Sequence, residues 1–199
     1  MNLVFVARSK SPDEWKAVAS AISTLVDEAT FEAAAEGISF RGMDPSHIAL
    51  IDIHWPNHAF EKYECDSLVK FGIRVDEFSK LIRRADKKDA VEISIGDDSM
   101  LHLKMSNSYK REYKSRLIES SASSTPLPKL NFNSKAVFTA IAFDKVLSDV
   151  QVVSEYISIE SKSGRITFSG RGDSGEADII LEAGNEGLEE LEANLREAE

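Results

Sequence analysis

Two histidines in the first half of the sequence have the residue type and spacing that metal binding uses. His54 and His58 are four residues apart, a spacing that can place two imidazole rings on one face of a helix. Pro56 and Asn57 lie between them, however, and His54 falls in an alternating pattern typical of a strand. We therefore expect the two rings not to converge, and we predict neither a bound metal ion nor another cofactor.

Four neighbouring residues have side chains of the kinds that nucleophilic or acid–base catalysis uses. Ser46 and His47 are adjacent in the chain, whereas a serine–histidine dyad is assembled in space from separate segments. Asp44 and Asp52 fall in a predicted turn and a predicted strand without a partner base. The sequence also has no glycine-rich loop of the kind that cradles phosphate. We therefore predict a protein that has no catalytic site and is not an enzyme.

The charge of the chain is unevenly distributed. Its formal net charge is −10 at pH 7, which by itself argues against a nucleic-acid-binding protein. Residues 70–88 are nevertheless rich in basic side chains, whereas residues 182–199 are rich in glutamate. This separation predicts surfaces of opposite charge. The basic residues of the first segment are Lys70, Arg74, Lys80, Arg83, Arg84, Lys87 and Lys88.

The elements that must position these residues are those of an α+β protein. Ser11 and Pro12 predict the start of an amphipathic helix that ends near Glu28, and a basic amphipathic helix is predicted over 75–86. A Ser/Pro-rich stretch at 119–128 predicts an extended connector. Alternating apolar residues predict strands at about 3–6, 30–33, 38–40, 48–54, 90–95, 100–106 and 109–117.

Part of the chain is present twice, 128 residues apart. Segment 38–53 matches 166–181, and the helical segment 15–27 matches 143–155. Each copy is predicted to form an amphipathic helix, a strand, a glycine turn and a second strand. A period of this size indicates a duplicated domain, because solenoid repeats are about 20–50 residues long. The matching strand residues are Ile38 and Ile166, Phe40 and Phe168, Gly42 and Gly170, Ala49 and Ala177, Ile51 and Ile179, and Ile53 and Leu181.

The duplication sets the predicted domain boundaries. We expect a first domain over 1–117, a connector over 118–131 and a partial second domain over 132–199. The second copy has no counterpart of 72–117, so we expect a chain that is truncated at its C-terminus. Residues 187–199 have helical propensity, but their match to a strand of the first copy predicts a strand near 189–194.

The composition is that of a globular protein, with 42% hydrophobic and 29% charged residues. No apolar run approaches the ~20 residues that a membrane-spanning helix needs, so we predict no membrane partner. The single cysteine, Cys65, excludes an intrachain disulfide and is typical of a reducing compartment. We therefore expect an intracellular protein.

The block FRGMDPSHIALIDI at residues 40–53 carries a resemblance to a known family. The chain closely resembles proliferating cell nuclear antigen, the DNA sliding clamp of archaea and eukaryotes, and is more archaeal than eukaryotic in character. Segments 25–29, 60–65 and 170–176 extend the likeness. The resemblance implies the DNA clamp fold, a duplicated domain with helices on one face of antiparallel sheets, which forms a ring. It also implies a processivity factor without an active site, which encircles duplex DNA and tethers polymerase and other replication and repair enzymes.

The resemblance further implies three functional surfaces. Basic residues on the helices face the DNA, and a groove beside the connector binds a short motif of a glutamine, an aliphatic and two aromatic residues. Edge strands at 112–116 and 177–181 pair between neighbouring subunits. The DNA-facing residues are Lys16, Lys80, Arg83, Arg84, Lys87 and Lys145; the groove residues are Met43, His47, Ile48, Leu50, Leu127 and Pro128; and the interface residues are Tyr113, Arg116, Ala177, Ile179 and Leu181.

The implied partners are duplex DNA, DNA polymerase, a clamp loader, a flap nuclease, a ligase, and two further copies of the chain in a homotrimer. An archaeal clamp is expected in the cytoplasm at the nucleoid, and a eukaryotic one in the nucleus. Two alternatives stay open. One is a clamp-like subunit of a heterotrimeric repair or checkpoint ring, and the other is an acidic α+β enzyme or protein-binding module unrelated to DNA.

Overall fold

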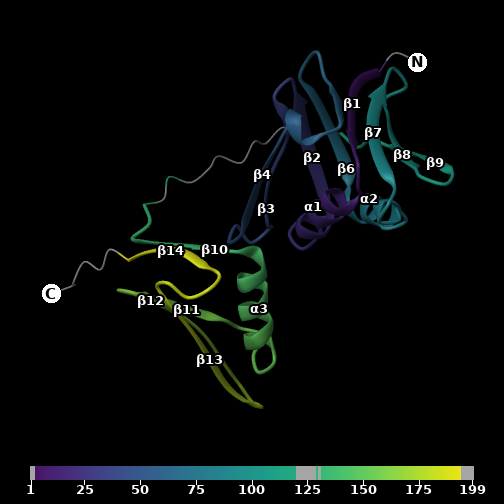
Figure 1. Cartoon of the computed structure of the whole chain (residues 1–199). Coiled ribbons are helices and arrows are strands. Elements are labelled where there is room, and N and C mark those ends of the chain that lie inside the picture. The colour runs from purple at the N-terminus through teal and green to yellow at the C-terminus, as the bar shows by residue number, and fades with distance from the viewer. Residues whose placement is uncertain (1–2, 120–128, 130, 194–199) are drawn as a thin grey trace. The chain divides into compact units, whose positions relative to one another are not determined.

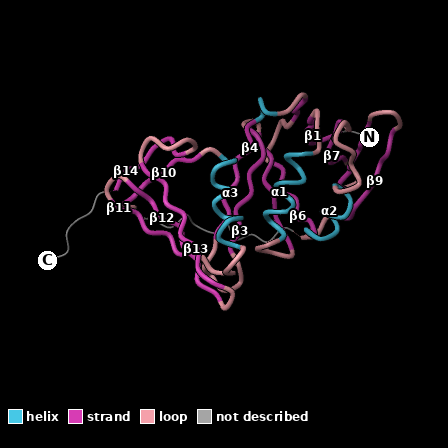
Figure 2. The backbone as a smooth tube through the Cα atoms, turned by 60° about the horizontal axis from the view of Figure 1, so that its bottom comes forward, coloured by secondary structure: helices cyan, strands magenta, loops and turns pink. Residues whose placement is uncertain are grey.

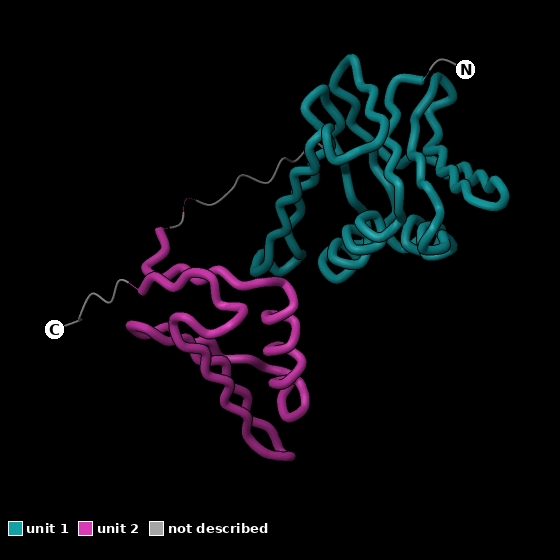
Figure 3. The backbone as a smooth tube through the Cα atoms, viewed as in Figure 1, with its two compact units in different colours: residues 1–127 teal, residues 128–199 magenta. Residues whose placement is uncertain are grey.

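The computed structural model describes residues 3–119, 129 and 131–193 (Figure 1). It divides into two compact units, residues 1–127 and residues 128–199 (Figure 3). Each unit combines antiparallel sheets with at least one helix (Figure 2). Among the described residues, no helix is long and apolar enough to cross a membrane.

Unit 1 contains β1 (Leu3–Ser9), α1 (Asp13–Ser23), β2 (Glu28–Ala34), β3 (Gly37–Met43), β4 (Leu50–Pro56), the short 3₁₀ helix η1 (Asn57–Ala59), β5 (Lys62–Glu64), β6 (Val69–Arg74), α2 (Val75–Ile82), β7 (Ala90–Gly96), β8 (Met100–Ser106) and β9 (Lys110–Arg116). One sheet has the order β5-β1-β7-β8-β9 and the other the order β4-β3-β2-β6. The core lies between them: the Phe71 ring stacks on Phe5 of the first sheet at 5.6 Å and on Phe31 of the second at 5.4 Å.

Helix α1 begins where the sequence predicts. The Ser11 Oγ accepts a hydrogen bond from the backbone N–H of Asp13 at 3.1 Å, and Pro12 already has helical angles of φ −82° and ψ −6°. The predicted apolar stripe faces the core. Within it, the Trp15 Nε1 donates a hydrogen bond to the Ser9 Oγ at 2.9 Å, which ties the helix to β1.

Both helices of unit 1 end earlier than predicted. Helix α1 ends at Ser23 instead of near 28, because the backbone N and the Oγ1 of Thr24 both donate to Ala21 O, at 3.3 and 2.7 Å, and close the last turn. Helix α2 ends at Ile82 instead of at 86, where a tighter turn follows with Ala85 N donating to Ile82 O at 3.0 Å. Both helices are therefore shorter than the sequence predicts.

Unit 2 repeats part of this plan with β10 (Ser134–Phe138), α3 (Ala140–Gln151), β11 (Ser158–Lys162), β12 (Arg165–Gly172), β13 (Gly175–Glu182) and β14 (Leu188–Ala193). Strand β10 pairs with β14, and the other three form a sheet in the order β11-β12-β13. The Thr139 Oγ1 accepts a hydrogen bond from Ala142 N at 3.2 Å and caps α3, at the position that matches Ser11 in the repeat.

The described part of unit 2 has no counterpart of β6, α2 or the strands after them. Trp15 and Phe31 of unit 1 are 3% and 5% exposed, and they pack against α2 and β6 respectively. Their counterparts Phe143 and Ile159 are 38% and 55% exposed. The core of unit 2 is correspondingly small, with the buried residues Val146, Val150, Ile166, Phe168, Leu181 and Leu188.

The repeat has a constant offset only up to the glycine turn. In unit 1 Ile38 pairs with Trp55, whereas in unit 2 its counterpart Ile166 pairs with Leu181. Strand β12 therefore matches β3 at an offset of 128 residues, but β13 matches β4 at an offset of 126. The cause is the turn: residues 44–49 form a six-residue loop, but only residues 173–174 separate β12 from β13. The predicted matches of Ala49, Ile51 and Ile53 with Ala177, Ile179 and Leu181 are therefore wrong by two residues.

The last described strand confirms a prediction against local propensity. Strand β14 pairs with β10, with Leu191 opposite Ala136 and Lys135 opposite Glu192. The sequence of this strand contains leucine, glutamate and alanine, which favour a helix. Pairing with a neighbouring strand and burial of Leu188 in the core outweigh that preference.

Candidate functional site

The loop between β3 and β4 is organised by the carboxylate of Asp44. Its Oδ1 accepts hydrogen bonds from the backbone N–H groups of Ile48 and Ala49 at 2.7 and 2.6 Å, and its Oδ2 accepts one from Ser46 at 2.9 Å. These bonds, the one from Ala49 most of all, favour the charged form and lower the pKa of Asp44. Asp44 therefore shapes the loop, and its oxygens are already engaged by backbone groups.

This loop and the strand ends that flank it carry four of the six predicted groove residues. His47 has a φ of +58°, and the neighbouring Ile48 is 88% exposed. Met43 and Leu50 pair at the base of the loop and are half-buried. An exposed aliphatic side chain thus stands above a partly apolar base. The two remaining groove residues, which lie outside the described part of the chain, are Leu127 and Pro128.

Replacing Asp44 by asparagine should loosen the loop without disturbing β3 and β4. Backbone amides at Ser46, Ile48 and Ala49 should exchange severalfold faster, because charge-assisted hydrogen bonds are stronger than neutral ones. Acid should loosen the loop of the wild-type protein in the same way, because protonation removes the charge of Asp44. Since the pKa of Asp44 is lowered in the folded protein, its stabilisation of the loop is complete above the ordinary pKa of 3.8 and is lost as the pH falls through the folded pKa.

The matched control for this prediction is Asp52→Asn. Asp52 lies on the adjacent strand β4, and its Oδ2 accepts a hydrogen bond from the Arg41 Nη2 at 3.0 Å. This variant removes the same charge but none of the loop bonds, so the amides of residues 46–49 should keep their exchange rates. Equal exchange in Asp44→Asn and the wild type would show that the carboxylate does not hold the loop.

The segment that leads into the connector is anchored at Gly72. Ile118 N donates a hydrogen bond to Gly72 O at 3.0 Å, and the two residues form an antiparallel bridge. A Cβ on Gly72 would lie 2.8 Å from the Ile118 Cγ1 and also 2.8 Å from its carbonyl oxygen. These separations are too short for real side chains, so this close approach needs glycine.

Replacing Gly72 by alanine should release Ile118 from β6. The expected result is faster amide exchange at Ile118 and earlier proteolysis at 117–119, while β2 and the rest of β6 keep their protection. Limited proteolysis followed by mass spectrometry measures both effects. An unchanged cleavage pattern would mean that the segment is held by other contacts.

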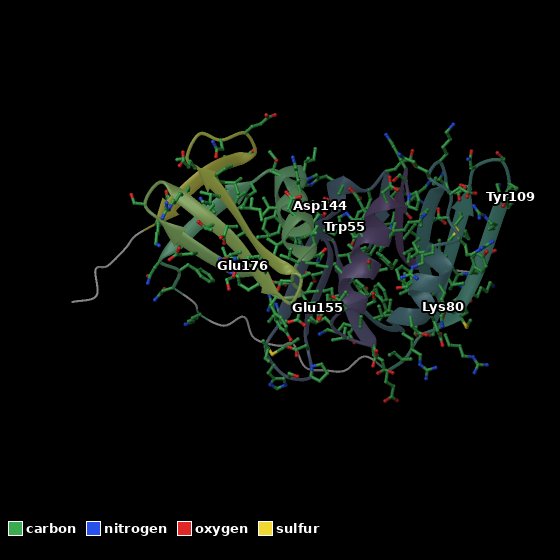
Figure 4. All side chains as sticks on the ribbon, turned by 90° about the horizontal axis from the view of Figure 1, so that it is seen from below. Trp55, Lys80, Tyr109, Asp144, Glu155 and Glu176 are labelled. Carbon is green, nitrogen blue, oxygen red and sulfur yellow. The ribbon has the colours of Figure 1, made fainter. Side chains whose placement is uncertain are left out.

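Helix α2 and the turn after it carry most of the predicted DNA-facing residues. Lys80 lies at the surface of α2 (Figure 4), with its Nζ 3.0 Å from the Asp76 Oδ2 in an exposed i,i+4 pair of the kind that contributes little. Arg83, Arg84 and Lys87 are exposed, and none forms an ion pair among the described residues. These four cations lie within residues 80–87, and all four are exposed.

The other two predicted DNA-facing residues differ from this group. Lys145 is exposed on α3, where Asp144 and Asp149 are exposed as well (Figure 4 labels Asp144). Lys16 of α1 is half-buried, and its Nζ donates a hydrogen bond to Ala85 O at 2.6 Å. Lys16 thus already has a partner within its own unit.

Both predicted interface segments are edge strands. Strand β9 ends the five-stranded sheet of unit 1, and β13 ends the three-stranded sheet of unit 2. Such strands present unpaired N–H and C=O groups on their free side. Tyr113 packs partly buried against the core of unit 1, and Arg116 is exposed. On β13, Ala177 and Ile179 are half-buried and Leu181 belongs to the core.

Sequence reasoning missed a buried histidine beside β9. His102 is 1% exposed, and its Nε2 lies 2.8 Å from the Asp98 Oδ2 while its Nδ1 lies 3.2 Å from the Glu112 Oε1. The hydrogen bond with His102 lowers the pKa of Glu112. The three residues fasten β9 to β8 and to the turn before β8. Their spacing of 98, 102 and 112 matches no motif, so only strand pairing could have revealed the cluster.

The two histidines with metal-binding spacing lie on different elements. His54 lies in β4 and His58 in η1, and both are exposed. Within the part of the chain that the structure describes, no three histidine, cysteine, aspartate or glutamate side chains are placed to hold a metal ion.

Comparison with known proteins identifies the family. The family model described as "Proliferating cell nuclear antigen, N-terminal domain" matches residues 4–122. The chain belongs to the proliferating cell nuclear antigen family. A protein of Nitrosopumilus maritimus (strain SCM1) named "DNA polymerase sliding clamp" is 60% identical over 95% of this chain and 75% of its own length. A protein of the same name from Cenarchaeum symbiosum (strain A) is 57% identical over the same shares.

The clamp fold is confirmed as well. The crystal structure of the proliferating cell nuclear antigen from Thermococcus kodakaraensis matches with a TM-score of 0.87 and 26% identity, over 96% of this chain and 78% of that one. The predicted class, α+β with antiparallel sheets, and the archaeal character of the resemblance are thus both supported.

Proposed function

We infer that this chain is a sliding clamp, which encircles duplex DNA and holds DNA polymerase on it as a processivity factor. The observation that carries this conclusion is the 60% identity, over 95% of the chain, to a protein named a DNA polymerase sliding clamp. A clamp works by topology, so it needs no residue that reacts with a substrate. We propose a tethering role rather than a catalytic one, at the nucleoid.

We propose that the cations at 80–87 face the DNA. A ring that slides must contact phosphates without reading bases, and each neutralised phosphate adds salt-dependent affinity. The exposure of Lys80, Arg83, Arg84 and Lys87 in one segment supports this role. Lys145 adds one exposed cation on α3. Because the whole chain carries a net charge of −10, a local basic surface directs the DNA to this face.

We propose that three copies close a homotrimeric ring through β9 of one copy and β13 of the next. Head-to-tail pairing of two different edges generates a ring when the rotation closes. The free edges of both strands support this arrangement. Because each chain holds two related units, three chains give a ring of six similar units. The duplication thus gives the ring pseudo-sixfold symmetry.

We propose that DNA polymerase, the clamp loader, flap nuclease and ligase dock a short aromatic motif on the loop between β3 and β4. The groove consists of Met43, His47, Ile48 and Leu50, with Leu127 and Pro128 contributed by the connector. The exposed Ile48 above the half-buried Met43 and Leu50 suits the apolar anchor of a short helical turn.

Primer extension on a long, singly primed circular template tests this function. The expected result is that the chain lengthens the products that a DNA polymerase carrying the docking motif synthesises in a single binding event. The gain should disappear when Ile48 is replaced by lysine, because the docking motif then meets a charge. Products of unchanged length with the folded wild-type chain would contradict the proposal.

A further inference from the structure

Two inward-pointing cations hold the carbonyl groups that follow helix α2. The Lys16 Nζ donates to Ala85 O at 2.6 Å, and the Arg111 Nη1 donates to Arg84 O, also at 2.6 Å. Lys16 comes from α1 and Arg111 from β9, so two different elements reach the same turn. The Arg111 side chain is only 14% exposed, and Lys16 is half-buried.

Arg111 is itself fixed by the turn that it holds. Its Nη2 lies 3.4 Å from the Asp86 Oδ2 and also pairs with the Asp89 carboxylate. Asp89 is 1% exposed, and its Oδ2 accepts a second hydrogen bond, from Asp86 N at 2.6 Å. The guanidinium carbon lies 4.9 Å from the centre of the Tyr109 ring. These contacts form one closed network between β9 and the turn.

The chemistry of a helix end explains why cations are used here. The last carbonyl groups of a helix lack partners within it and carry the negative end of its dipole. A lysine or arginine supplies both the hydrogen bond and the opposite charge. On either side of these two anchored carbonyls, the side chains of Arg83, Arg84, Lys87 and Lys88 are exposed, without an ion pair in the described chain. The turn therefore presents its cations from a fixed backbone.

We propose that Lys16 and Arg111 are positioning residues, which hold the turn at 83–88 so that its exposed cations meet the phosphates, and that neither residue contacts DNA. This assignment rests on the proposed clamp function and departs from the expectation that Lys16 faces the DNA. A fixed turn loses less conformational freedom on binding, so the anchors raise affinity without adding a phosphate contact.

The test compares Lys16→Met with Lys145→Met, because both remove one lysine charge from the full chain. Affinity for a short DNA duplex is measured by fluorescence anisotropy across salt concentrations, and amide exchange is measured at 84–88. Each phosphate contact adds about 0.9 to the slope of log affinity against log salt. We expect Lys16→Met to keep the slope, to lower affinity roughly two- to fivefold as for a lost helix-end cation, and to speed exchange at 84–88. Lys145→Met should lower the slope by about 0.9 and leave exchange unchanged.

Two outcomes overturn the proposal. One is a slope for Lys16→Met that falls by about 0.9 with unchanged exchange, which marks Lys16 as a phosphate contact. The other is a Lys16→Arg variant that keeps the charge and a donor but fails to restore both affinity and protection. If neither Lys145→Met nor Arg83→Ala changes DNA affinity, the DNA-facing surface of the proposed function is wrong. Exchange at 84–88 then still decides whether Lys16 holds the turn.

Discussion

Replacing Phe168 by alanine is expected to unfold unit 2 while unit 1 stays folded. Phe168 is 1% exposed, and its ring lies 5.7 Å from that of Phe138 and 6.2 Å from that of Phe143. Removing a buried phenylalanine side chain costs about 3–5 kcal/mol of unfolding free energy. A core in a unit of this size rarely supplies more than about 3–5 kcal/mol. The variant should therefore lose amide protection throughout β11, β12 and β13.

Tryptophan fluorescence separates the two units in this experiment, because both tryptophans, Trp15 and Trp55, are buried in unit 1. The fluorescence transition of Phe168→Ala should match that of the wild type, whereas amide exchange reports the loss of unit 2. The matched control is Phe40→Ala, the counterpart of Phe168 in the repeat. It should lower the stability of unit 1 by about 3–5 kcal/mol and leave unit 2 protected. One joint transition in both variants would contradict independent folding.

Replacing Ile180 by lysine is expected to abolish assembly. Ile180 lies on the edge strand β13 and is 52% exposed, so the change leaves the core of unit 2 intact. Natural proteins use lysine on edge strands to prevent pairing with another chain. A central interface side chain contributes about 2 kcal/mol or more, and a closed ring loses this at every junction. Light scattering should show the mass fall from about 66 kDa, three chains of 22.0 kDa, to 22.0 kDa.

The control for assembly is Ile48→Lys, which makes the same substitution at an exposed position outside both edge strands. Its mass should stay at that of the wild type, although its docking groove is altered. An Ile180→Lys protein that keeps the trimer mass would show that β13 is not at the junction. A wild-type mass of 22.0 kDa at every concentration would contradict self-assembly of this chain.

The resemblance carried by residues 40–53 predicts the clamp fold, and the local signals and the repeat agree with it. Ser11 and Thr139 both begin helices, at matching positions of the two copies. The strand at 188–193 could be predicted only from the repeat, since its own residues favour a helix. The register after the glycine turn could not be predicted, because it depends on the length of the loop between the two strands. Residues 173–174 connect the strands of unit 2, whereas the six residues 44–49 connect those of unit 1.

The site is less accessible to sequence reasoning than the fold. The basic residues at 80–87 are visible as a cluster in the sequence, and the exposure of Lys80 follows from the amphipathic pattern of α2. The partners of Lys16 and Arg111 are backbone oxygens at 85 and 84, which carry no residue signature. The sequence predicts Asp44 to be an acid without a partner base, whereas the structure shows its carboxylate accepting backbone hydrogen bonds across the loop. Hydrogen bonds from side chains to backbone groups, local or long-range, are thus what the sequence pattern does not show.

The most direct test of the clamp assignment is retention on DNA of defined topology. The chain is loaded by a clamp loader onto a nicked circular plasmid, the complex is isolated by gel filtration, and half of it is cut with a restriction enzyme. We predict that the chain stays with the circle at a salt concentration that abolishes simple charge attraction, and that it leaves the linear DNA through its ends. Equal retention on both forms, or none on the circle, would contradict a ring that encircles DNA.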